Sequence, residues 1–490
     1  MSRKASVLLL GICVLMVAPS ATPLLGAPAS AKPNAGQITF ELKYRGLTGA
    51  KGEPRVSSYW GFGSSNEPQS PFTKSLNLPK EKVIYIPRLP LLAQAGNESA
   101  LALELDGDKS VALYVDLNGD GKLSPNEKIL PSKEKSPRDP GTLYVTPDFK
   151  VKTKNGKESP YRLFLIDGTY SAAGGKVRHS PEFSPACLWE GAGVMDGKPF
   201  HLVLLDNDFD GQFTQFGQDG CALMPEAEYA KALESGYLPR ERLSRLVPIG
   251  QQFYTLRMET TPDGAQPARA VLTKSESPLG KIALELKGSE GMKAVLTSLY
   301  LCGREGDTFF NLAGKGAIEQ ALPVGSYLVE NGAISYGSAN PEEWLTDFSS
   351  GPEITVSADA SCLLKLGQPK LTPSVVKRQD RYRPDAKPGA VFKKGDDIYC
   401  SPEVKGMASE KYRSFSRMSG DKVPDPTIRI VDANGKEVAS ASISMPYGSR
   451  GSGLSWKTQN VEPGKYTVLM TVETGPLAGK LEGKTEITIE

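Results

Sequence analysis

The strand and loop that decide the fold read Val111-Ala-Leu-Tyr-Val-Asp116-Leu-Asn-Gly-Asp-Gly-Lys-Leu-Ser-Pro-Asn-Glu127. The first five residues have the apolar, β-branched character of a strand. The twelve that follow place acids or amides at every second position, then a glycine for a sharp turn, and end on a glutamate. Calcium is a hard cation that takes several oxygen ligands, and a loop of this composition supplies them. The segment therefore predicts a calcium site at the end of a β-hairpin.

Each position of this first loop (residues 116–127) has an expected role. The expected ligands are the side chains of Asp116, Asn118, Asp120, Ser124 and Glu127 and the backbone carbonyl of Lys122, with Gly121 at the turn. The pattern resembles the calcium loop of EF-hand proteins, and the resemblance covers this segment alone. An EF-hand has a helix on each side of its loop, whereas here a strand enters and Pro131 ends any helix that follows. We expect a calcium loop grafted onto a hairpin; the alternative is an Asx-rich surface turn that holds no ion.

A second acidic loop (residues 206–219) follows the strand predicted at Phe200–Leu205 in the same way. Its alternating acids and its glycine match the first loop, but Gly217 stands where the closing glutamate would be, which weakens the site. We expect Asp219 to close the shell if the loop bulges. The expected ligands are Asp206, Asp208, Asp210, Gln212 and Asp219. The alternative is an acidic turn held by Asx hydrogen bonds.

The amino terminus has the pattern of a secretory signal peptide. Arg3 and Lys4 precede an apolar run, and small residues end at Ala31 in an A-x-A arrangement, which predicts cleavage there. The run is short for a membrane span, and no later segment is apolar enough to be one. We expect a mature chain without a transmembrane segment that is secreted, periplasmic or attached to the cell envelope.

Charge argues against nucleic acid as a partner. The sequence contains 58 Lys and Arg and 56 Asp and Glu, and loss of Arg3 and Lys4 with the signal peptide makes the two counts equal. Binding to phosphates requires an excess of clustered basic residues. A basic run from Lys377 to Arg383 reads as a solvated connector, with contact to an acidic polysaccharide as the alternative.

Abundant Gly and Pro, with few long helical runs, predict a mainly β chain of several β-sandwich-like domains in tandem, with few short helices. Helices are expected from Glu226 to a stop at Gly236, and from Asn340. Two Pro-Gly-Tyr arrangements, which end at Tyr327 and Tyr466, are typical of β-sandwiches. The expected units are a signal peptide at 1–31, a β domain at 32–150, a β unit with a short helix at 151–248, a β-sandwich-like domain at 249–365, a linker at 366–389, and a β-sandwich at 390–490.

Five cysteines remain after the expected cleavage, and an odd number leaves at least one unpaired in an oxidising compartment. The pairings that stay within one expected unit are Cys187 with Cys221 and Cys302 with Cys362. The alternative is that all are buried free thiols, Cys400 included. None of the spacings matches a close C-x-x-C metal or redox motif.

The sequence shows no arrangement that predicts an enzyme. Histidine occurs only at 179 and 201, and no nucleophile motif, Walker loop, dinucleotide fingerprint or zinc-protease motif is present. The strongest acid clusters are spaced as calcium ligands, which would occupy oxygens that glycoside hydrolysis needs.

The last hundred residues resemble the immunoglobulin-like sandwiches of secreted bacterial proteins, on the turn and tyrosine pattern that ends at Tyr466. The whole chain is similar to secreted bacterial proteins that combine β-flanked calcium loops with such domains. The resemblance implies a scaffold or adhesion role with envelope glycans or proteins as candidate partners. A carbohydrate-binding or carbohydrate-processing protein is the alternative, with the aromatic segment Tyr59–Phe62 as its candidate contact, unless that loop is tucked into the core.

Overall fold

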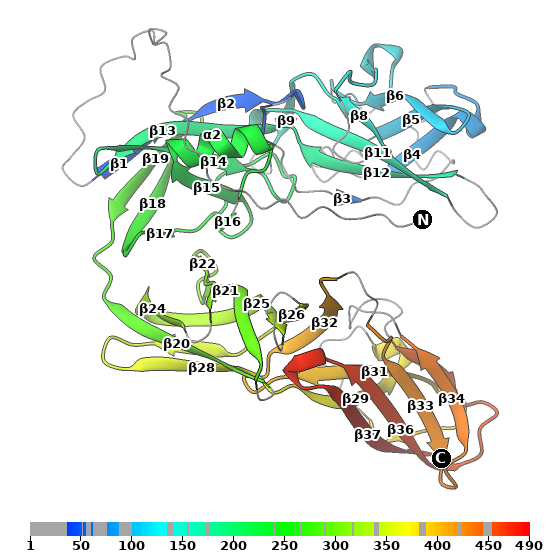
Figure 1. Ribbon diagram of the computed structural model, residues 1–490. Helices are drawn as coiled ribbons and strands as arrows, with labels where there is room; N and C mark the ends of the chain where they lie inside the picture. Colours follow the sequence, from blue (N-terminus) through cyan, green and yellow to red (C-terminus); the bar gives the residue numbers. More distant parts are fainter. Residues whose placement is uncertain are drawn as a thin grey trace.

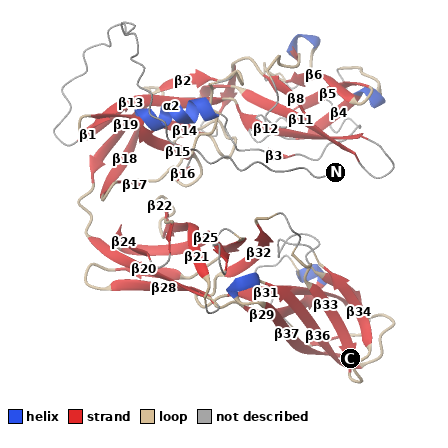
Figure 2. Ribbon diagram, in the orientation of Figure 1, coloured by secondary structure: helices blue, strands red, loops and turns tan. Residues whose placement is uncertain are grey.

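The computed structural model describes residues 37–50, 52–54, 60–61, 76–87, 100–118, 120, 122–134, 141–153, 156–171, 177–239, 241–264, 266–288, 291–315, 318–337, 343–381, 389–419, 423–443 and 453–490. The chain is mainly β, as its composition predicts, with several separate sheets (Figures 1 and 2). The predicted signal peptide, with Arg3, Lys4 and Ala31, and the segment 62–75 lie outside the described residues.

The described sheets separate into two groups at residues 275–278. All pairs among β1–β19 lie within residues 37–274, which we call the N-terminal body, and all pairs among β20–β37 lie within residues 279–490, the C-terminal body. In the described ranges no strand pair joins the two bodies. Figure 1 shows them one above the other, connected at β19 and β20.

The N-terminal body contains four larger sheets and a two-stranded one. The first sheet is β4 (Val83–Pro87), β5 (Ala100–Asp106), β6 (Lys109–Val115) and β7 (Lys128–Ile129). The second is β3 (Trp60–Gly61), β12 (Val177–Pro185), β11 (Leu163–Ser171) and β8 (Gly141–Val145). The third is β16 (Glu241–Arg242), β15 (Gly220–Pro225), β14 (Lys198–Leu205), β13 (Cys187–Met195) and β2 (Lys43–Gly46). The fourth is β1 (Gln37–Glu41), β19 (Pro267–Lys274), β18 (Gln252–Thr260) and β17 (Leu246–Ile249), and β9 (Phe149–Lys152) pairs with β10 (Glu158–Tyr161).

The C-terminal body contains three sheets. One is β24 (Ile318–Pro323), β20 (Leu279–Lys287) and β28 (Ser361–Gly367). The ten-stranded sheet consists of β21 (Lys293–Gly303), β22 (Phe309–Asn311), β23 (Gly314–Lys315), β25 (Gly325–Gly337), β26 (Trp344–Ser349), β27 (Glu353–Val356), β29 (Lys370–Lys377), β31 (Asp397–Lys405), β32 (Lys411–Arg417) and β35 (Leu454–Lys457). The third is β30 (Val391–Phe392), β37 (Lys480–Ile489), β36 (Gly464–Glu473), β33 (Thr427–Asp432) and β34 (Glu437–Ser442).

Long-range pairing crosses the unit boundaries that the sequence suggested. β1 pairs with β19 and β2 pairs with β13, so residues near 40 belong to sheets completed by residues near 190 and 270. The boundary expected after residue 248 falls in the hairpin β17–β18, and β26 pairs with β32 across the linker expected at 366–389. Part of that linker is strand β29, whose Leu371 and Val375 are buried in the core.

The predicted helix from Glu226 is α2 (Glu226–Ser235), and Gly236 ends it with a φ of 68°. Tyr229 and Ala232 of α2 pack on Val203 and Ala222 of the third sheet, so that the helix covers one face of β14 and β15. On the other face of these strands, Leu202, Leu204 and Cys221 belong to the large core cluster of the N-terminal body, which also contains Leu256 and Leu272 of the fourth sheet. The residues 340–342 that would open the second expected helix lie outside the described ranges, and 344–349 form β26 instead.

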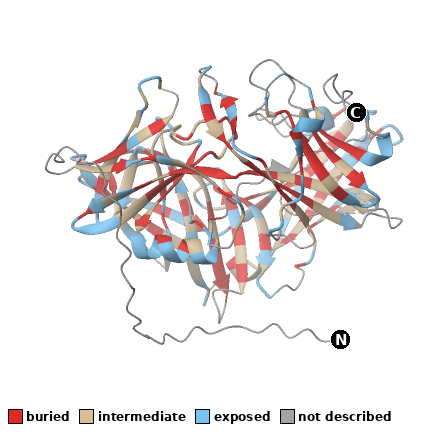
Figure 3. Cartoon of the chain, turned by 90° about the horizontal axis from the view of Figure 1, so that it is seen from above, coloured by how far each residue is buried: buried red, intermediate tan, exposed pale blue. Residues whose placement is uncertain are grey.

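Four short 3-10 helices complete the described elements: η1 (Lys80–Lys82), η3 (Pro125–Glu127), η4 (Arg378–Asp380) and η5 (Gly475–Leu477). Buried residues, coloured red in Figure 3, occur along the strands of both bodies.

The two Pro-Gly-Tyr arrangements share one geometry. The hydroxyl of Tyr327 donates a 2.7 Å hydrogen bond to the carbonyl of Pro323, and the hydroxyl of Tyr466 donates a 2.6 Å bond to the carbonyl of Glu462. Each tyrosine therefore ties the start of a core strand to the backbone four residues before it, as a tyrosine corner does.

Candidate metal centre

The second acidic loop brings three carboxylates together. It leaves the end of β14 and returns as β15, so its acids lie at the end of a hairpin of the third sheet. One carboxylate oxygen from each of Asp206, Asp208 and Asp210 lies within 4.8 Å of the other two. Among the described residues this is the only group of three or more His, Cys, Asp or Glu side chains that meets this criterion. Three of the predicted ligands thus come together.

Asp206 is held by the protein core. Its side chain is fully buried, and the hydroxyl of Tyr161 donates a 2.8 Å hydrogen bond to its Oδ2. The backbone N–H groups of Phe209 and Gly211 donate to its two oxygens at 2.7 and 2.9 Å. Tyr161 lies 45 residues away in the sequence, on β10, so no local pattern could have identified it as part of the site.

Asp210 is oriented by two glutamines. Gln212 donates to Oδ1 of Asp210 through its backbone and to Oδ2 through its side chain, each at 2.9 Å. The side chain of Gln215 donates to the same Oδ2 at 2.6 Å. Gln212, which the sequence suggested as a metal ligand, therefore supports Asp210 in this structure. Gln215 was not among the predicted ligands, although its position inside the loop was a local signal.

Asp219 lies next to the three acids, and it is completely buried. Its Oδ2 accepts a 2.7 Å hydrogen bond from the backbone of Gln215, whereas its Oδ1 has no hydrogen-bond partner among the described residues. Gly217 precedes it with a φ of 80°, a left-handed conformation that suits glycine. A buried carboxylate oxygen without a donor is costly, so this atom is suited to contact a cation.

The electrostatics of the loop agree with that conclusion. Burial raises the pKa of Asp206, and the charges of Asp208 and Asp210 raise it further. Burial likewise raises the pKa of Asp219, with the charge of Asp206 as the next largest cause. Clustered acids with raised pKa values are disfavoured in their charged forms, and a bound cation would favour those forms. Carboxylate oxygens are the ligands of hard cations such as calcium, so the donor set fits that ion.

The first loop is arranged differently. Glu127, only 5% exposed, belongs to η3, and its carboxylate clamps the loop. Its Oε2 accepts hydrogen bonds from the backbone and hydroxyl of Ser124 at 2.9 and 3.1 Å, and its Oε1 accepts one from the backbone of Leu117 at 3.0 Å. Glu127, one of the expected ligands, therefore acts as a capping residue for the 3-10 turn η3 that closes the loop.

The remaining residues of the first loop form Asx-type turns. Oδ1 of Asn118 accepts a bond from the backbone of Asp120 at 2.7 Å, and Oδ1 of Asp120 accepts one from the backbone of Lys122 at 2.8 Å. Asp116 is 8% exposed, and Gly121 lies outside the described residues. As predicted, a strand (β6) enters the loop and no α-helix follows it, because η3 leads directly into β7.

The two histidines have structural partners. Nδ1 of His179 on β12 lies 2.8 Å from Oδ2 of Asp167 on the paired strand β11, and both side chains are buried. The ring of His201 stacks on Tyr229 with centroids 4.2 Å apart, and its Nε2 lies 2.5 Å from Glu226. His201 is thus packed under α2.

The proposed disulfides are wrong. All five described cysteines are free thiols, with Cys187, Cys221 and Cys400 buried and Cys302 and Cys362 half-buried. Cys187 and Cys221 lie on β13 and β15, which are separated by β14, so the two are not strand neighbours. The alternative of unpaired thiols is what the structure shows.

The basic run has acidic and aromatic partners where it is described. Lys377 pairs with Asp396 at 3.0 Å, Arg378 with Asp397 at 3.6 Å, and the guanidinium of Arg381 lies over the ring of Tyr399. Of the aromatic segment Tyr59–Phe62, only β3 is described, where Trp60 pairs with Phe183.

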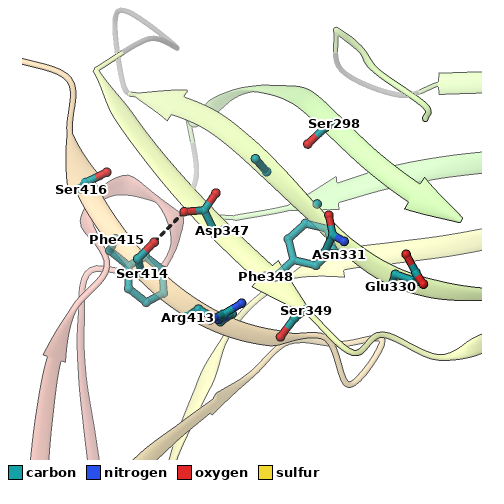
Figure 4. A pocket seen from close by; sticks show the side chains of 12 residues that line it. Ser298, Glu330, Asn331, Asp347, Phe348, Ser349, Arg413, Ser414, Phe415 and Ser416 are labelled. Carbon is teal, nitrogen blue, oxygen red and sulfur yellow. Dashed lines mark hydrogen bonds between the residues drawn. The ribbon is translucent and has the colours of Figure 1, made fainter. Parts of the chain in front are cut away.

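A groove of about 700 Å³, lined by both polar and apolar groups, lies over β25, β26 and β32 of the C-terminal body (Figure 4). Hydroxyl, amide and charged side chains line it, among them Asn331, Asp347 and Arg413. Oδ2 of Asp347 accepts a 2.8 Å hydrogen bond from the hydroxyl of Ser414. A register shift between Asp347 and Phe348 places this carboxylate at a β-bulge.

Within the described ranges, none of the helices has the length and apolar character needed to cross a membrane.

No protein-family model matches the chain, and neither does any curated protein. Among solved structures, the chain is similar to the Bacillus anthracis TIE protein, with 13% sequence identity, coverage of 76% of this chain and 79% of that one, and a TM-score of 0.14. It is also similar to the pilus adhesin SpaC from Lactobacillus rhamnosus GG, with 10% identity, coverage of 93% of this chain and 55% of that one, and a TM-score of 0.11. At such TM-scores neither likeness indicates a function for this chain.

Proposed function

We propose that this chain is an exported calcium-binding protein of the cell envelope or extracellular space, in which calcium stabilises loops at the ends of β-hairpins. The observation that supports it most directly is the gathering of Asp206, Asp208 and Asp210 beside the fully buried Asp219. The predicted signal peptide supports export. An exported protein can use weak calcium sites, because calcium is plentiful outside the cytoplasm and extracellular modules work at a Kd of roughly 10⁻⁴–10⁻³ M.

The residues that would hold the ion in the second loop are Asp206, Asp208, Asp210 and Asp219. Calcium would supply the positive charge that these carboxylates lack and would hold the ends of β14 and β15 together. At a calcium concentration about 100-fold above the Kd, binding adds about 2.7 kcal/mol to the free energy of unfolding. The role of calcium would be structural. The bound ion would order the loop, and the added stability would help a scaffold or adhesion protein to stay folded outside the cell.

The experiment is a calorimetric calcium titration of the chain with paired variants. Asp208→Asn/Asp210→Asn removes charge from the second loop, and Asp116→Asn/Asp120→Asn removes it from the first. Asp196→Asn is the matched control, since Asp196 lies exposed in the turn between β13 and β14. We expect wild type and the control to bind calcium, and the second-loop variant to lose one site. Wild type that shows neither binding heat nor a thermal shift at millimolar calcium would refute the proposal.

The groove over β25, β26 and β32 supports a second candidate function, binding of carbohydrate. Its volume is within the range of ligand sites, and its hydroxyl, amide and carboxylate groups suit a ligand rich in hydroxyls. A glycan-array screen of wild type beside Asp347→Ala/Arg413→Ala tests it. Hits that the variant loses would support this function, and an array without hits would count against it.

A further inference from the structure

The second acidic loop also lies at the contact between the two bodies. We call this contact the joint; it involves residues 216–217 and 242–245 of the N-terminal body and residues 306–309 and Glu330 of the C-terminal body. A Cβ atom at Gly217 would come within 2.7 Å of the Phe309 ring and 2.8 Å of the carbonyl oxygen of Gly306. The loop backbone therefore packs directly on the turn that precedes β22 in the C-terminal body. Figure 1 shows β22 as the element of that body which projects toward β16 and β17.

A short strip of backbone, residues 243–245, connects the loop to the other body. The backbone of Gly217 donates a 2.8 Å hydrogen bond to the carbonyl of Leu243, and the backbone of Leu243 donates one of 2.8 Å to the carbonyl of Asp219. The strip is thus paired with the segment that ends in the buried acid. Leu243 is therefore bonded directly to Asp219 and also to Gly217, two residues before it.

The next two residues of the strip bind the C-terminal body. The backbone of Phe309 donates a 2.9 Å hydrogen bond to the hydroxyl of Ser244, and the backbone of Arg245 donates one of 2.7 Å to the carbonyl of Asp307. Nε of Arg245 also lies 2.5 Å from Oδ2 of Asp307. The route from the acids to the C-terminal body therefore passes through adjacent residues of one strip.

Two arginines strengthen the joint. The Arg242 side chain lies 2.7 Å from Glu330 and over the ring of Phe309, at 5.2 Å from its centroid. The guanidinium of Arg245 lies over the ring of Phe216, at 4.9 Å, inside the acidic loop itself. One side chain, Arg245, thus contacts both the loop and the other body.

We propose that a calcium ion in the second loop and the contact between the two bodies stabilise one another, so that calcium regulates how firmly the bodies are joined. The inference rests on the proposed function, because it requires the ion to bind there. Without the ion, no cation holds the clustered acids of the second loop together, and the segment that holds Leu243 is fixed less firmly. With the ion the segment is fixed and presents Ser244 and Arg245 to Asp307 and Phe309.

Because binding free energies are linked, changes in the C-terminal body can reveal this coupling through their effect on calcium affinity. If calcium strengthens the joint by some factor, then breaking the joint weakens calcium binding by the same factor. Residues of the C-terminal body that touch no acid of the loop should therefore alter calcium affinity. A loop that binds calcium independently of the joint gives no such effect.

The test measures calcium affinity by calorimetry in the Asp116→Asn/Asp120→Asn background, where the heat reports on the second loop alone. Asp307→Ala/Phe309→Ala removes the contact from the C-terminal side. Glu330→Gln, which breaks the ion pair with Arg242 and keeps the packing, is a milder second variant. Leu328→Ala is the control, since this side chain is 45% exposed on β25.

We expect Asp307→Ala/Phe309→Ala to weaken calcium binding by about fivefold or more, Glu330→Gln to weaken it less, and the control to match the background. The coupling would be overturned if Asp307→Ala/Phe309→Ala and Glu330→Gln both bind calcium as tightly as the background protein while Asp208→Asn/Asp210→Asn loses binding. The proposed function would then still stand. Absence of binding in the background protein would overturn both.

Discussion

The hydroxyl of Tyr161 donates a 2.8 Å hydrogen bond to Oδ2 of Asp206, and both side chains are fully buried. A residue of the two-stranded β9–β10 sheet thus holds the first acid of a loop on the third sheet. The bond matters for stability because burial of a carboxylate costs free energy, and each hydrogen bond that the carboxylate accepts offsets part of this cost.

Replacement of Tyr161 by Phe should therefore lower the free energy of unfolding by about 1–3 kcal/mol in the presence of a chelator. Denaturant titration followed by circular dichroism measures this change. Tyr170→Phe is the control. Tyr170 is 53% exposed on β11, the next strand along the chain, so its replacement should change the free energy of unfolding little. Equal stabilities for the two variants would contradict the role given to the hydrogen bond.

Glu127 should contribute to stability even without metal. Its two oxygens accept hydrogen bonds from Leu117 and Ser124 across the first loop. Glu127→Gln replaces one acceptor oxygen by a donor, and we expect a loss of about 1–2 kcal/mol in chelator. Glu134→Gln, at an exposed bend, is the control. If Glu127→Gln is as stable as wild type in chelator and differs only in calcium, its function is metal binding alone.

Acid should weaken the sheet that holds the first loop. Nζ of Lys128 lies 2.7 Å from Oε2 of Glu104, and this hydrogen bond lowers the pKa of the Glu104 carboxyl. A lowered pKa in the folded state gives stability that is present above about pH 4.5 and is lost as the pH falls through the folded pKa. Because the pair is partly exposed, its contribution is about 0.5–1 kcal/mol.

Glu104→Gln isolates this contribution. The difference in unfolding free energy between wild type and Glu104→Gln should be largest near neutral pH and should shrink as the pH is lowered from about 6 to 3. Urea titrations at each pH measure it. A difference that stays constant over this range would mean that the ion pair does not stabilise the sheet.

The free thiols should differ in reactivity. Burial raises the pKa of Cys221 and Cys400 to about 12 and raises that of Cys187 as well. Cys302 and Cys362 are half-buried. We expect a maleimide to modify Cys302 and Cys362 at least about tenfold faster than the other three in the native protein, because reaction requires an accessible thiolate.

Peptide mapping by mass spectrometry after timed quenching identifies the labelled sites. In denaturant without reductant, all five described cysteines should react. Any of them that reacts only after reduction would show a disulfide and contradict the free thiols of the structure.

Local chemistry determined much of what the sequence could predict. The hairpin β5–β6 depends on local pattern, because alternating apolar residues form its two strands and Gly107 and Asp108 form the tight turn between them. The stop of α2 at Gly236 follows from the left-handed conformation that glycine adopts without cost. The alternating acids of both loops were visible for the same reason: their pattern is contained within a dozen residues.

The two loops arrange their acids differently, and their residue types alone did not show this difference. The first has the complete set of ligand residue types, yet its Glu127 binds backbone and Ser124. The second lacks a closing glutamate, yet its acids come together. Residue types at fixed spacing specify which oxygens are available, whereas the surrounding packing decides where those oxygens point.

By itself, the sequence determined the β class, the hairpins, the helix from Glu226 and the two acidic loops, because each depends on neighbours along the chain. Only the tertiary structure decided that β1 completes a sheet with β19, that Tyr161 reaches Asp206, and that Gly217 packs on Phe309. These contacts join residues tens to hundreds of positions apart. Strand pairing and burial are set by which faces meet in the folded core, and no local pattern contains that information.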